Sequence, residues 1–426
     1  MDWLSKDKSL IWHPYTQQKT APPPIFIESA RGAWLYDDSG RAILDAISSW
    51  WVTLHGHAHP YIAEKLGAQA RKLEQVIFAG FTHRPAIELA EKLVPLLPGP
   101  FSRIFYSDNG STATEVAVKM AIQYWWNQSP STERRKILVL QDAYHGDTFG
   151  AMAVSGRSVF TEAFADYLFD VVSIPRPAAE NIEALQLQLE QEAHQYAAFI
   201  YEPLLQGAGG MQVYEAQWLN QLLVQLHRHG VICIADEVLT GFGRTGRLFA
   251  SENMEEKPDI ICLSKGLTGG TLALGVTACT ETIFNAYCND DRRKTLFHGH
   301  SFTANPLACT AAIASLELFE KEGTLERVAN IGRWHAEALE HFQAELGRAG
   351  KIGGLRQQGT ILAFEIDQAR NQYLSAIGPE ITQRALAQNI YLRPLGNTLY
   401  FLPPYCLTRE EHAQLTESTV NICRKL

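Results

Sequence analysis

The stretch Val231-Ile232-Cys233-Ile234-Ala235-Asp236-Glu237 is an apolar run that ends in two acids. A second run, Asp259-Ile260-Ile261-Cys262-Leu263-Ser264, ends directly in Lys265 and a glycine-rich turn. Both runs are short and rich in branched apolar residues, which favours strands buried on both faces of a sheet. Ligands of such sheets bind at the carboxyl ends of the strands. The two runs therefore predict an acid and a lysine at the same edge of a sheet.

Similar short apolar runs lie on either side of this pair. They are Arg103–Ser107, Lys136–Gln141, Ala197–Glu202 and Gly275–Cys279. Helix-like stretches separate them, among them Thr114–Trp126 and Ala216–His229. Strands that alternate with helices predict an α/β fold, with a mostly parallel central sheet covered on both faces.

The two ends of the chain have a different pattern. The runs around Ile25–Ile27 and Ala33–Tyr36 resemble short antiparallel strands. A long helical stretch runs from Asn305 through Glu322, and a mixed segment follows that ends in Tyr391–Tyr405. We expect a large domain and a small α/β domain built from both termini. The predicted boundaries are residues 56–310 for the large domain and 1–55 with 311–426 for the small one.

Composition limits the classes of protein to which the chain can belong. Its 426 residues are 46% hydrophobic and 19% charged, which provides a substantial core and argues against wholesale disorder. The net charge of -9 argues against a nucleic-acid-binding protein. No uncharged apolar stretch approaches the roughly 18 residues of a membrane span. The seven scattered cysteines form no CxxC pair, so we expect reduced thiols and a cytoplasmic location.

Asp236 and Lys265 together suit one kind of chemistry. A lysine at the end of a buried strand is partly desolvated, which lowers its pKa and frees the amine to form a Schiff base. An acid on the neighbouring strand end can hold a pyridine nitrogen protonated, as pyridoxal 5'-phosphate (PLP) requires. Singly, each residue is more simply explained as a helix cap or an exposed turn lysine. The combination favours a PLP site.

Two further segments fit that cofactor. Ser107-Asp108-Asn109-Gly110-Ser111-Thr112 connects a predicted strand to a helix that we expect to begin near Thr114. Free N–H groups at a helix start, with a glycine and hydroxyls, form an anion site, although an ordinary N-cap loop has the same pattern. Tyr144 follows another strand, where it is placed either to cover a pyridine face or to pack at the rim.

Two other motifs favour simpler explanations. His55, His57 and His59 alternate as metal ligands do, but no nearby Cys, Asp or Glu cluster completes a set, so we expect a structural loop and predict no metal site. The segment Gly241–Gly246 has the glycine spacing of a dinucleotide-binding loop. The acids before it, and the lack of a βαβ unit after it, argue against that function.

Asp236–Gly246, together with Ser264–Gly270, resembles the signature of the class III aminotransferases. The resemblance continues through Gly56–Pro60, Glu202–Pro203 and Gln206–Gly210, and so extends along nearly the whole chain. It implies a PLP-dependent transferase of fold type I that works by ping-pong transamination. It also implies a homodimer with shared active sites.

Within that class, the chain is similar to the adenosylmethionine–8-amino-7-oxononanoate aminotransferases of biotin biosynthesis. The segments that carry the similarity are Ile11–Thr16, Ser48–Trp51, Tyr144–Gly150, Leu392–Gly396, Tyr400 and Pro403–Tyr405. Ala208 stands where the ornithine and acetylornithine branch commonly has a glutamate. The implied reaction transfers an amino group from S-adenosylmethionine to 7-keto-8-aminopelargonate (8-amino-7-oxononanoate). Lysine as the donor, another ω-amino-acid or diamine aminotransferase, an aminomutase, and a binding protein without turnover stay open as alternatives.

The resemblance also implies roles for the cofactor residues. Lys265 forms the Schiff base, Asp236 pairs with the pyridinium, and Tyr144 stacks on the ring. The residues that bind the phosphate are Gly110 and Ser111, joined across a dimer interface by Gly299 and Ser301. Family members often have threonine in place of Ser301, which keeps the hydroxyl.

The implied substrate residues are Tyr15, Trp50, Arg393 and Tyr400, with Gly299 at the border of the pocket. Arg393 is suited to a bidentate pair with the acceptor's carboxylate. Aromatic faces suit both the acceptor's apolar chain and the sulfonium of the donor. Because neighbouring side chains alternate along a strand, we expect only one of Trp50 and Trp51 to line the site.

Overall fold

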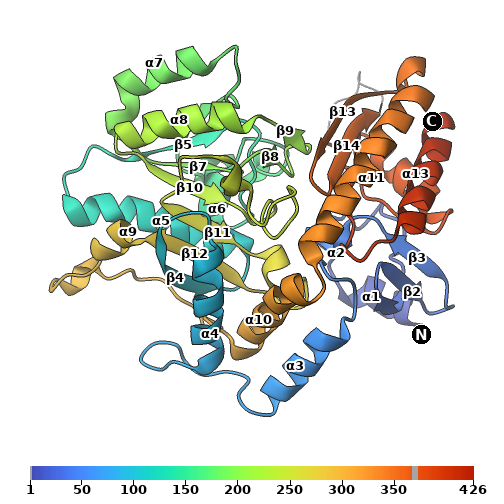
Figure 1. The fold of residues 1–426 in the computed structure, drawn as a ribbon, viewed down its shortest axis with the longest axis horizontal. Helices are drawn as coiled ribbons and strands as arrows, with labels where there is room; N and C mark the ends of the chain where they lie inside the picture. The colour runs from blue at the N-terminus through green and yellow to red at the C-terminus, as the bar shows by residue number, and fades with distance from the viewer. Residues whose placement is uncertain (1, 367–372) are drawn as a thin grey trace.

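The structure is a computed structural model that describes residues 2–366 and 373–426. Its centre is a seven-stranded sheet (Figure 1). In spatial order the strands are β4 (Phe101–Ser107), β12 (Gly275–Thr280), β11 (Ile260–Leu263), β10 (Ile232–Asp236), β7 (Tyr196–Tyr201), β5 (Lys136–Leu140) and β6 (Val172–Ile174). β12 is antiparallel to both of its neighbours, and the other six strands run parallel to one another. The predicted α/β class with a mostly parallel sheet is confirmed.

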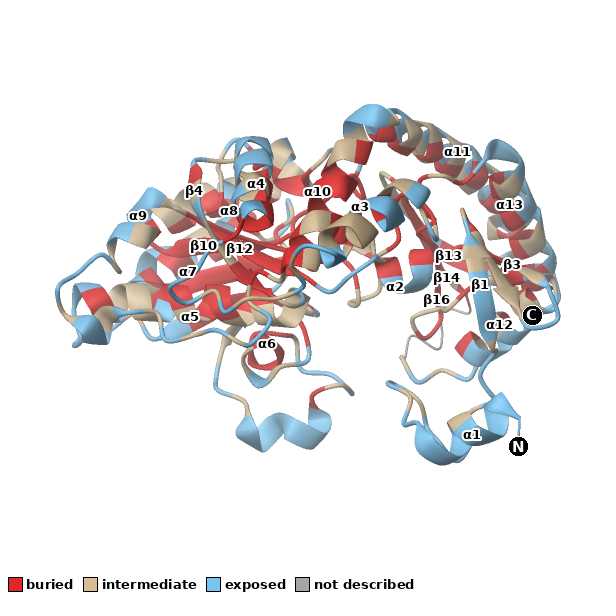
Figure 2. Ribbon diagram, turned by 90° about the horizontal axis from the view of Figure 1, so that it is seen from below, coloured by how far each residue is buried: buried red, intermediate tan, exposed pale blue. Residues whose placement is uncertain are grey.

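Side-chain alternation along β10 shows how both faces of this sheet are covered. Ile232 and Ile234 belong to the core under α5 (Gly110–Gln128). Cys233 and Ala235 belong to the core under α8 (Ala216–Arg228). The buried strands therefore lie between two helical layers, and they form the red centre of Figure 2.

Local sequence explains the two covering helices. α8 (Ala216–Arg228) buries Leu219, Leu222, Leu223 and Leu226, the spacing of one helical face. α5 begins at Gly110, earlier than the predicted start near Thr114, because the side chain of Asn109 caps it. The Asn109 side-chain oxygen accepts the Thr112 N–H at 2.9 Å, which satisfies one of the free donors of the first turn.

The two ends of the chain share a sheet. β1 (Ile27–Arg31), β2 (Trp34–Asp37) and β3 (Ala42–Asp45) are antiparallel neighbours, and β15 (Ile390–Tyr391) joins β3 in parallel. β1 begins two residues later than the predicted run. In Figure 1 the blue strands lie beside the orange and red elements, at the side of the molecule away from α7 (Ile182–Glu192) and α8. The domain boundaries themselves stay a prediction.

The C-terminal part adds a second, antiparallel sheet and three helices. The strands are β13 (Ile352–Gln358), β14 (Ile361–Ile366) and β16 (Thr398–Phe401), and the helices are α11 (Thr324–Glu345), α12 (Ile377–Leu386) and α13 (Arg409–Arg424). α13 was not predicted. Its buried face includes His412, Thr416 and Thr419, and these polar residues hide the helical period of its apolar ones.

The other α-helices and strands of the described chain connect or flank these sheets. They are α1 (Trp3–Leu10), α2 (Ser48–Trp51), α3 (Pro60–Ala70), α4 (Arg84–Leu93), α6 (Phe149–Ala153), α9 (Glu281–Asn285), α10 (Pro306–Lys321), β8 (Leu205–Gln206) and β9 (Gln212–Val213). α10 confirms the predicted helical stretch after Asn305. Within the described part of the chain, no helix has the length and apolar character needed to cross a membrane.

Candidate active site

Asp236 and Lys265 meet at the carboxyl edge of the central sheet, as predicted. Asp236 is the last residue of β10, and Lys265 follows β11, the parallel neighbour of β10. Both line a cavity of about 650 Å³. The φ of Lys265 is 41°, a strained left-handed conformation of the kind that concentrates at functional sites.

The amine of Lys265 is poised to lose its proton. Its Nζ lies 4.6 Å from the centroid of the Trp51 ring. Burial lowers the pKa of Lys265 to about 8, although the carboxylates of Asp236 and Glu202 act in the opposite direction. About a tenth of such lysines carry the free, nucleophilic amine at pH 7.

The carboxylate of Asp236 is held from two sides. Its Oδ2 lies 2.7 Å from Nδ1 of the buried His145, and its Oδ1 accepts the Val238 N–H at 3.0 Å. Because an ionised carboxylate can only accept hydrogen bonds, Nδ1 of His145 is the donor. His145 therefore holds the acid in a fixed orientation.

Glu202, directly after β7, is a second buried acid that lines the cavity. Its Oε1 accepts the Tyr144 N–H at 3.1 Å, and its Oε2 accepts the Gly207 N–H at 2.9 Å. Burial raises the pKa of Glu202 to about 7. Sequence reasoning did not assign Glu202 to the site, although it ends its strand just as Asp236 does.

The start of α5 lies on the same cavity and suits an anion. Gly110 and Ser111 line the cavity, and as first-turn residues they have N–H groups without intrahelical acceptors. A Cβ on Gly110 would lie 2.7 Å from Cγ1 of Val238, so the close packing requires glycine. Ser111 Oγ accepts the Asp147 N–H at 3.0 Å, which leaves the hydroxyl hydrogen free to donate.

Aromatic residues cover another side of the cavity. Tyr144 lines it, and its hydroxyl lies 3.4 Å from that of Tyr15. Tyr15 donates to Oδ2 of Asp147 at 2.6 Å, and its ring meets the Trp50 ring edge-on at 5.4 Å. Sequence reasoning missed Asp147, because nothing in the local pattern shows which hydroxyl it accepts.

The prediction of a strand at Trp50 and Trp51 is wrong. The segment forms α2, where Ser48, Ser49 and Trp51 have positive φ, and of the two tryptophans Trp51 is the one that lines the cavity. Trp51 is buried against Lys265 and donates from Nε1 to the buried hydroxyl of Tyr400 at 2.9 Å. Trp50 is more exposed and stacks under the Arg393 guanidinium at 4.5 Å. Trp51 thus contacts the reactive lysine, although Trp50 was the residue chosen from sequence.

Gly299 and Ser301 are not part of the lining that the described residues of this chain provide to the cavity. The side-chain amide of Gln75 donates to the Ser301 carbonyl. His300 lies between them in the sequence. Its Nε2 is 4.0 Å from the carboxylate of Asp108, in the loop that leads into α5. Their role across a dimer interface stays a prediction.

The three alternating histidines have separate partners. His55 pairs with Ser315 Oγ at 3.0 Å, while His57 and His59 meet the carboxylates of Asp45 and Glu322 at 2.9 and 3.0 Å. Each imidazole therefore serves a different packing contact, in agreement with the structural-loop interpretation.

Comparisons with known proteins agree with this geometry. The family described as aminotransferase class-III matches residues 15–423. The adenosylmethionine-8-amino-7-oxononanoate aminotransferase of Synechococcus elongatus is 48% identical, over 94% of this chain and 95% of its own length. The Mycobacterium leprae protein of the same name is 37% identical, over 98% of this chain and 95% of its own length.

Solved structures show the same relationship. The enzyme of that name from Methanocaldococcus jannaschii superposes with a TM-score of 0.93 at 34% identity, over 99% of this chain and 98% of that one. An omega transaminase from Pseudomonas jessenii in complex with PMP superposes with a TM-score of 0.91 at 26% identity, over 100% and 98% of the two chains. The chain belongs to the class III aminotransferases, which are PLP-dependent enzymes.

Proposed function

We propose that this chain transfers an amino group from S-adenosylmethionine to 8-amino-7-oxononanoate, giving 7,8-diaminononanoate in biotin biosynthesis. The observation that carries the proposal is the pairing of Lys265 and Asp236 on neighbouring strand ends, at a cavity that the aromatic side chains of Trp51 and Tyr144 also line. The relatives from Synechococcus elongatus and Mycobacterium leprae are named for the same pair of substrates, which supports the proposal.

The residues present fit PLP. Lys265 Nζ would hold its aldehyde, Asp236 would face its ring nitrogen, and the start of α5 at Gly110 and Ser111 would hold its phosphate. Tyr144 would cover a face of the ring. When bound, the cofactor supplies an electron sink that lowers the cost of removing a proton beside the amine.

The protein's own groups then divide the work. The donor's amine would displace Lys265 from the cofactor. The freed Nζ then accepts the proton from the amine-bearing carbon of the donor, and in the second half-reaction it returns a proton to the acceptor's carbon. Asp236, held by His145, keeps a positive charge on the ring nitrogen opposite it. Trp51, fixed by its bond to Tyr400, confines the lysine amine and excludes water on that side.

The pocket suits both substrates. A second cavity of about 630 Å³ shares Tyr144, Gly146, Asp147 and Ala208 with the first, so there is room for a donor as large as S-adenosylmethionine. The rings of Tyr15 and Trp50 are suited to its sulfonium or to the acceptor's apolar chain. The stacked guanidinium of Arg393 keeps its N–H edges available for the acceptor's carboxylate.

Arg393→Ala tests the carboxylate contact. We expect the acceptor half-reaction to lose on the order of 10²-fold in kcat/KM, because a charge-paired carboxylate loses its partner. The donor half-reaction should change by less than about fivefold. Single-turnover absorbance measurements of each half-reaction separate the two effects. Equal losses in both halves would refute the assignment, and Arg393→Lys should restore only part of the loss.

The pKa of Lys265 gives a pH prediction for the cofactor-free protein. Since only the neutral amine attacks an aldehyde, PLP uptake should speed up about tenfold per pH unit below pH 8 and level off above it. Stopped-flow absorbance at saturating PLP measures this rate. A rate that still climbs between pH 9 and pH 10 would mean that the amine keeps the pKa of an ordinary exposed lysine.

We also infer that the active form is a homodimer, with Gly299 and Ser301 reaching the phosphate of the partner's site. Phe297 and Phe302 flank this segment and are 73% and 62% exposed, as at an interface that a second copy covers. Light scattering after gel filtration should give twice the 47.5 kDa chain mass. A fully active monomer would rule out the shared site.

The product assay tests the whole proposal. Purified protein is incubated with PLP, 8-amino-7-oxononanoate and one donor at a time, and the diamine is measured by mass spectrometry. We expect product with S-adenosylmethionine and at least tenfold less with lysine or ω-amino acids. Product with lysine alone would change the donor, and turnover of other carbonyl acceptors without this one would change the function.

A further inference from the structure

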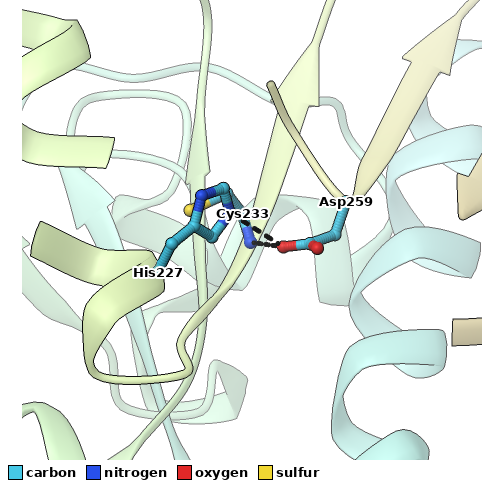
Figure 3. Close-up of side chains that lie close together, drawn as sticks. All are labelled: His227, Cys233 and Asp259. Carbon is cyan, nitrogen blue, oxygen red and sulfur yellow. Dashed lines mark hydrogen bonds and ion pairs between the residues drawn. The ribbon is translucent and has the colours of Figure 1, made fainter. Parts of the chain in front are cut away.

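We propose that His227, Cys233 and Asp259 form a binding site for one zinc-like divalent cation, with Glu256 orienting the histidine. Figure 3 shows the three side chains converging from different elements. His227 lies in the last turn of α8, Cys233 in β10, and Asp259 directly before β11. The cluster is therefore at the amino edge of the strands whose carboxyl ends carry Asp236 and Lys265.

The geometry is close to that of a metal site. The candidate ligand atoms of His227, Cys233 and Asp259 all lie within 4.8 Å of one another. Nε2 of His227 is 3.1 Å from Oδ2 of Asp259. Ligands held about 2.0–2.3 Å from a tetrahedral zinc ion lie roughly 3.3–3.8 Å apart. Small side-chain movements therefore suffice to bring the three atoms into a coordination sphere.

Glu256 supplies the support that a metal-binding histidine needs. Its Oε1 lies 2.6 Å from Nδ1 of His227. A carboxylate that accepts the Nδ1–H fixes the ring and leaves Nε2 as the ligand atom, as is usual for histidines bound to zinc. In this cluster Nε2 is the atom directed at Asp259. The ion pairs of His227 with Glu256 and Asp259 do not explain why the Cys233 thiol also lies within reach of the same point, whereas a metal site does.

The frame that holds the ligands is rigid. The Asp259 N–H donates to the Cys233 carbonyl at 2.9 Å, and the Cys233 N–H donates to Oδ2 of Asp259, also at 2.9 Å. The Cys233 thiol is buried, makes a long 3.7 Å contact to the Val231 carbonyl and interacts with the His227 imidazole. The three side chains are thus already gathered before any ion binds.

The ligand types select the ion. A thiolate, an imidazole and a carboxylate suit zinc better than magnesium or calcium, which prefer oxygen ligands. The side chains of His227 and Asp259 are 21% and 29% exposed, so the ion can enter from solvent and a water can fill the fourth position. Binding releases the Cys233 thiol proton and any proton on Nε2 to the buffer. The bound ion would tie α8 to the central sheet.

The test uses the full-length enzyme with its PLP bound, treated with chelator and then dialysed with zinc. We expect one zinc per chain by elemental analysis and a rise in Tm. Zinc K-edge X-ray absorption should show one sulfur neighbour at about 2.3 Å. Cys233→Ser should lose that neighbour, and Glu256→Gln should weaken affinity about 10- to 100-fold. With chelator present, His227→Gln should have the same aminotransferase activity as the parent, since none of the four residues of the cluster lines the active-site cavity.

Two matched controls separate this site from surface binding. Cys288→Ser and His194→Gln remove an exposed cysteine and an exposed histidine elsewhere, and both should bind zinc as the parent does. The proposal is overturned if no zinc is retained, if the bound zinc has no sulfur neighbour, or if His227→Gln binds as tightly as the parent. If Cys233→Ser does not fold, the zinc affinity of His227→Gln and the X-ray absorption spectrum of the parent protein still show whether zinc binds at this cluster.

Discussion

Lys265→Ala should lower kcat at least about 10⁴-fold, because it removes both the amine that holds PLP and the group that moves the proton. Lys265→Arg should be equally inactive, since a guanidinium keeps its proton at neutral pH. Lys265 is the one lysine among the described residues that line the cavity, so no neighbouring side chain there provides a free amine in its place.

The measurement for Lys265→Ala is steady-state product formation, with PLP content determined in the same samples. Lys72→Ala, which changes an exposed lysine, serves as the control and should keep full activity. If Lys265→Ala retained more than about one-hundredth of the parent kcat, the mechanism would need another lysine.

Asp236→Asn should cause the second large loss of kcat. The amide keeps the size of the side chain but loses the charge that stabilises a protonated ring nitrogen. We expect kcat to fall on the order of 10²–10³-fold, as when a preorganised electrostatic partner is removed. The amide NH₂ can also turn toward Nδ1 of His145, which would disturb the 2.7 Å pair that orients the acid.

The loss of the Asp236 charge can be separated from the loss of its contact with His145. His145→Gln should lower kcat less than Asp236→Asn, because it removes the orienting contact and keeps the charge. PLP content and Tm, measured for each variant, show whether the loss is in chemistry or in cofactor retention. Asp38→Asn at an exposed position is the control. A drop of less than fivefold in Asp236→Asn would contradict the pairing.

Strand sequences carried most of the fold prediction. Residues 231–235 and 260–263 are apolar at every position, because both faces of each strand are buried under helices. The same logic placed Asp236 and Lys265 together, since parallel neighbours end at one edge. Helix α13 was missed because its buried face is partly polar, and β6 because three residues carry little pattern.

Several side chains of the site depend on three-dimensional contacts that the sequence does not show. Trp51 reaches Lys265 through positive φ angles in α2, which an alternating pattern does not encode. Asp147 belongs to the site because it accepts a hydrogen bond from the Tyr15 hydroxyl, and Glu202 because it accepts one from the Tyr144 N–H. The cluster of His227, Cys233 and Asp259 likewise forms only when α8 and two strands meet.

The central claim is that Lys265 carries PLP and that S-adenosylmethionine delivers the amino group to it. The most direct measurement is the absorbance spectrum of the purified, PLP-loaded protein before and after S-adenosylmethionine is added alone. The account predicts that the band of lysine-bound cofactor is replaced by that of pyridoxamine phosphate, and that it returns when 8-amino-7-oxononanoate is added. A band that ignores S-adenosylmethionine but responds to lysine would contradict the donor, and no such band after incubation with PLP would contradict the site itself.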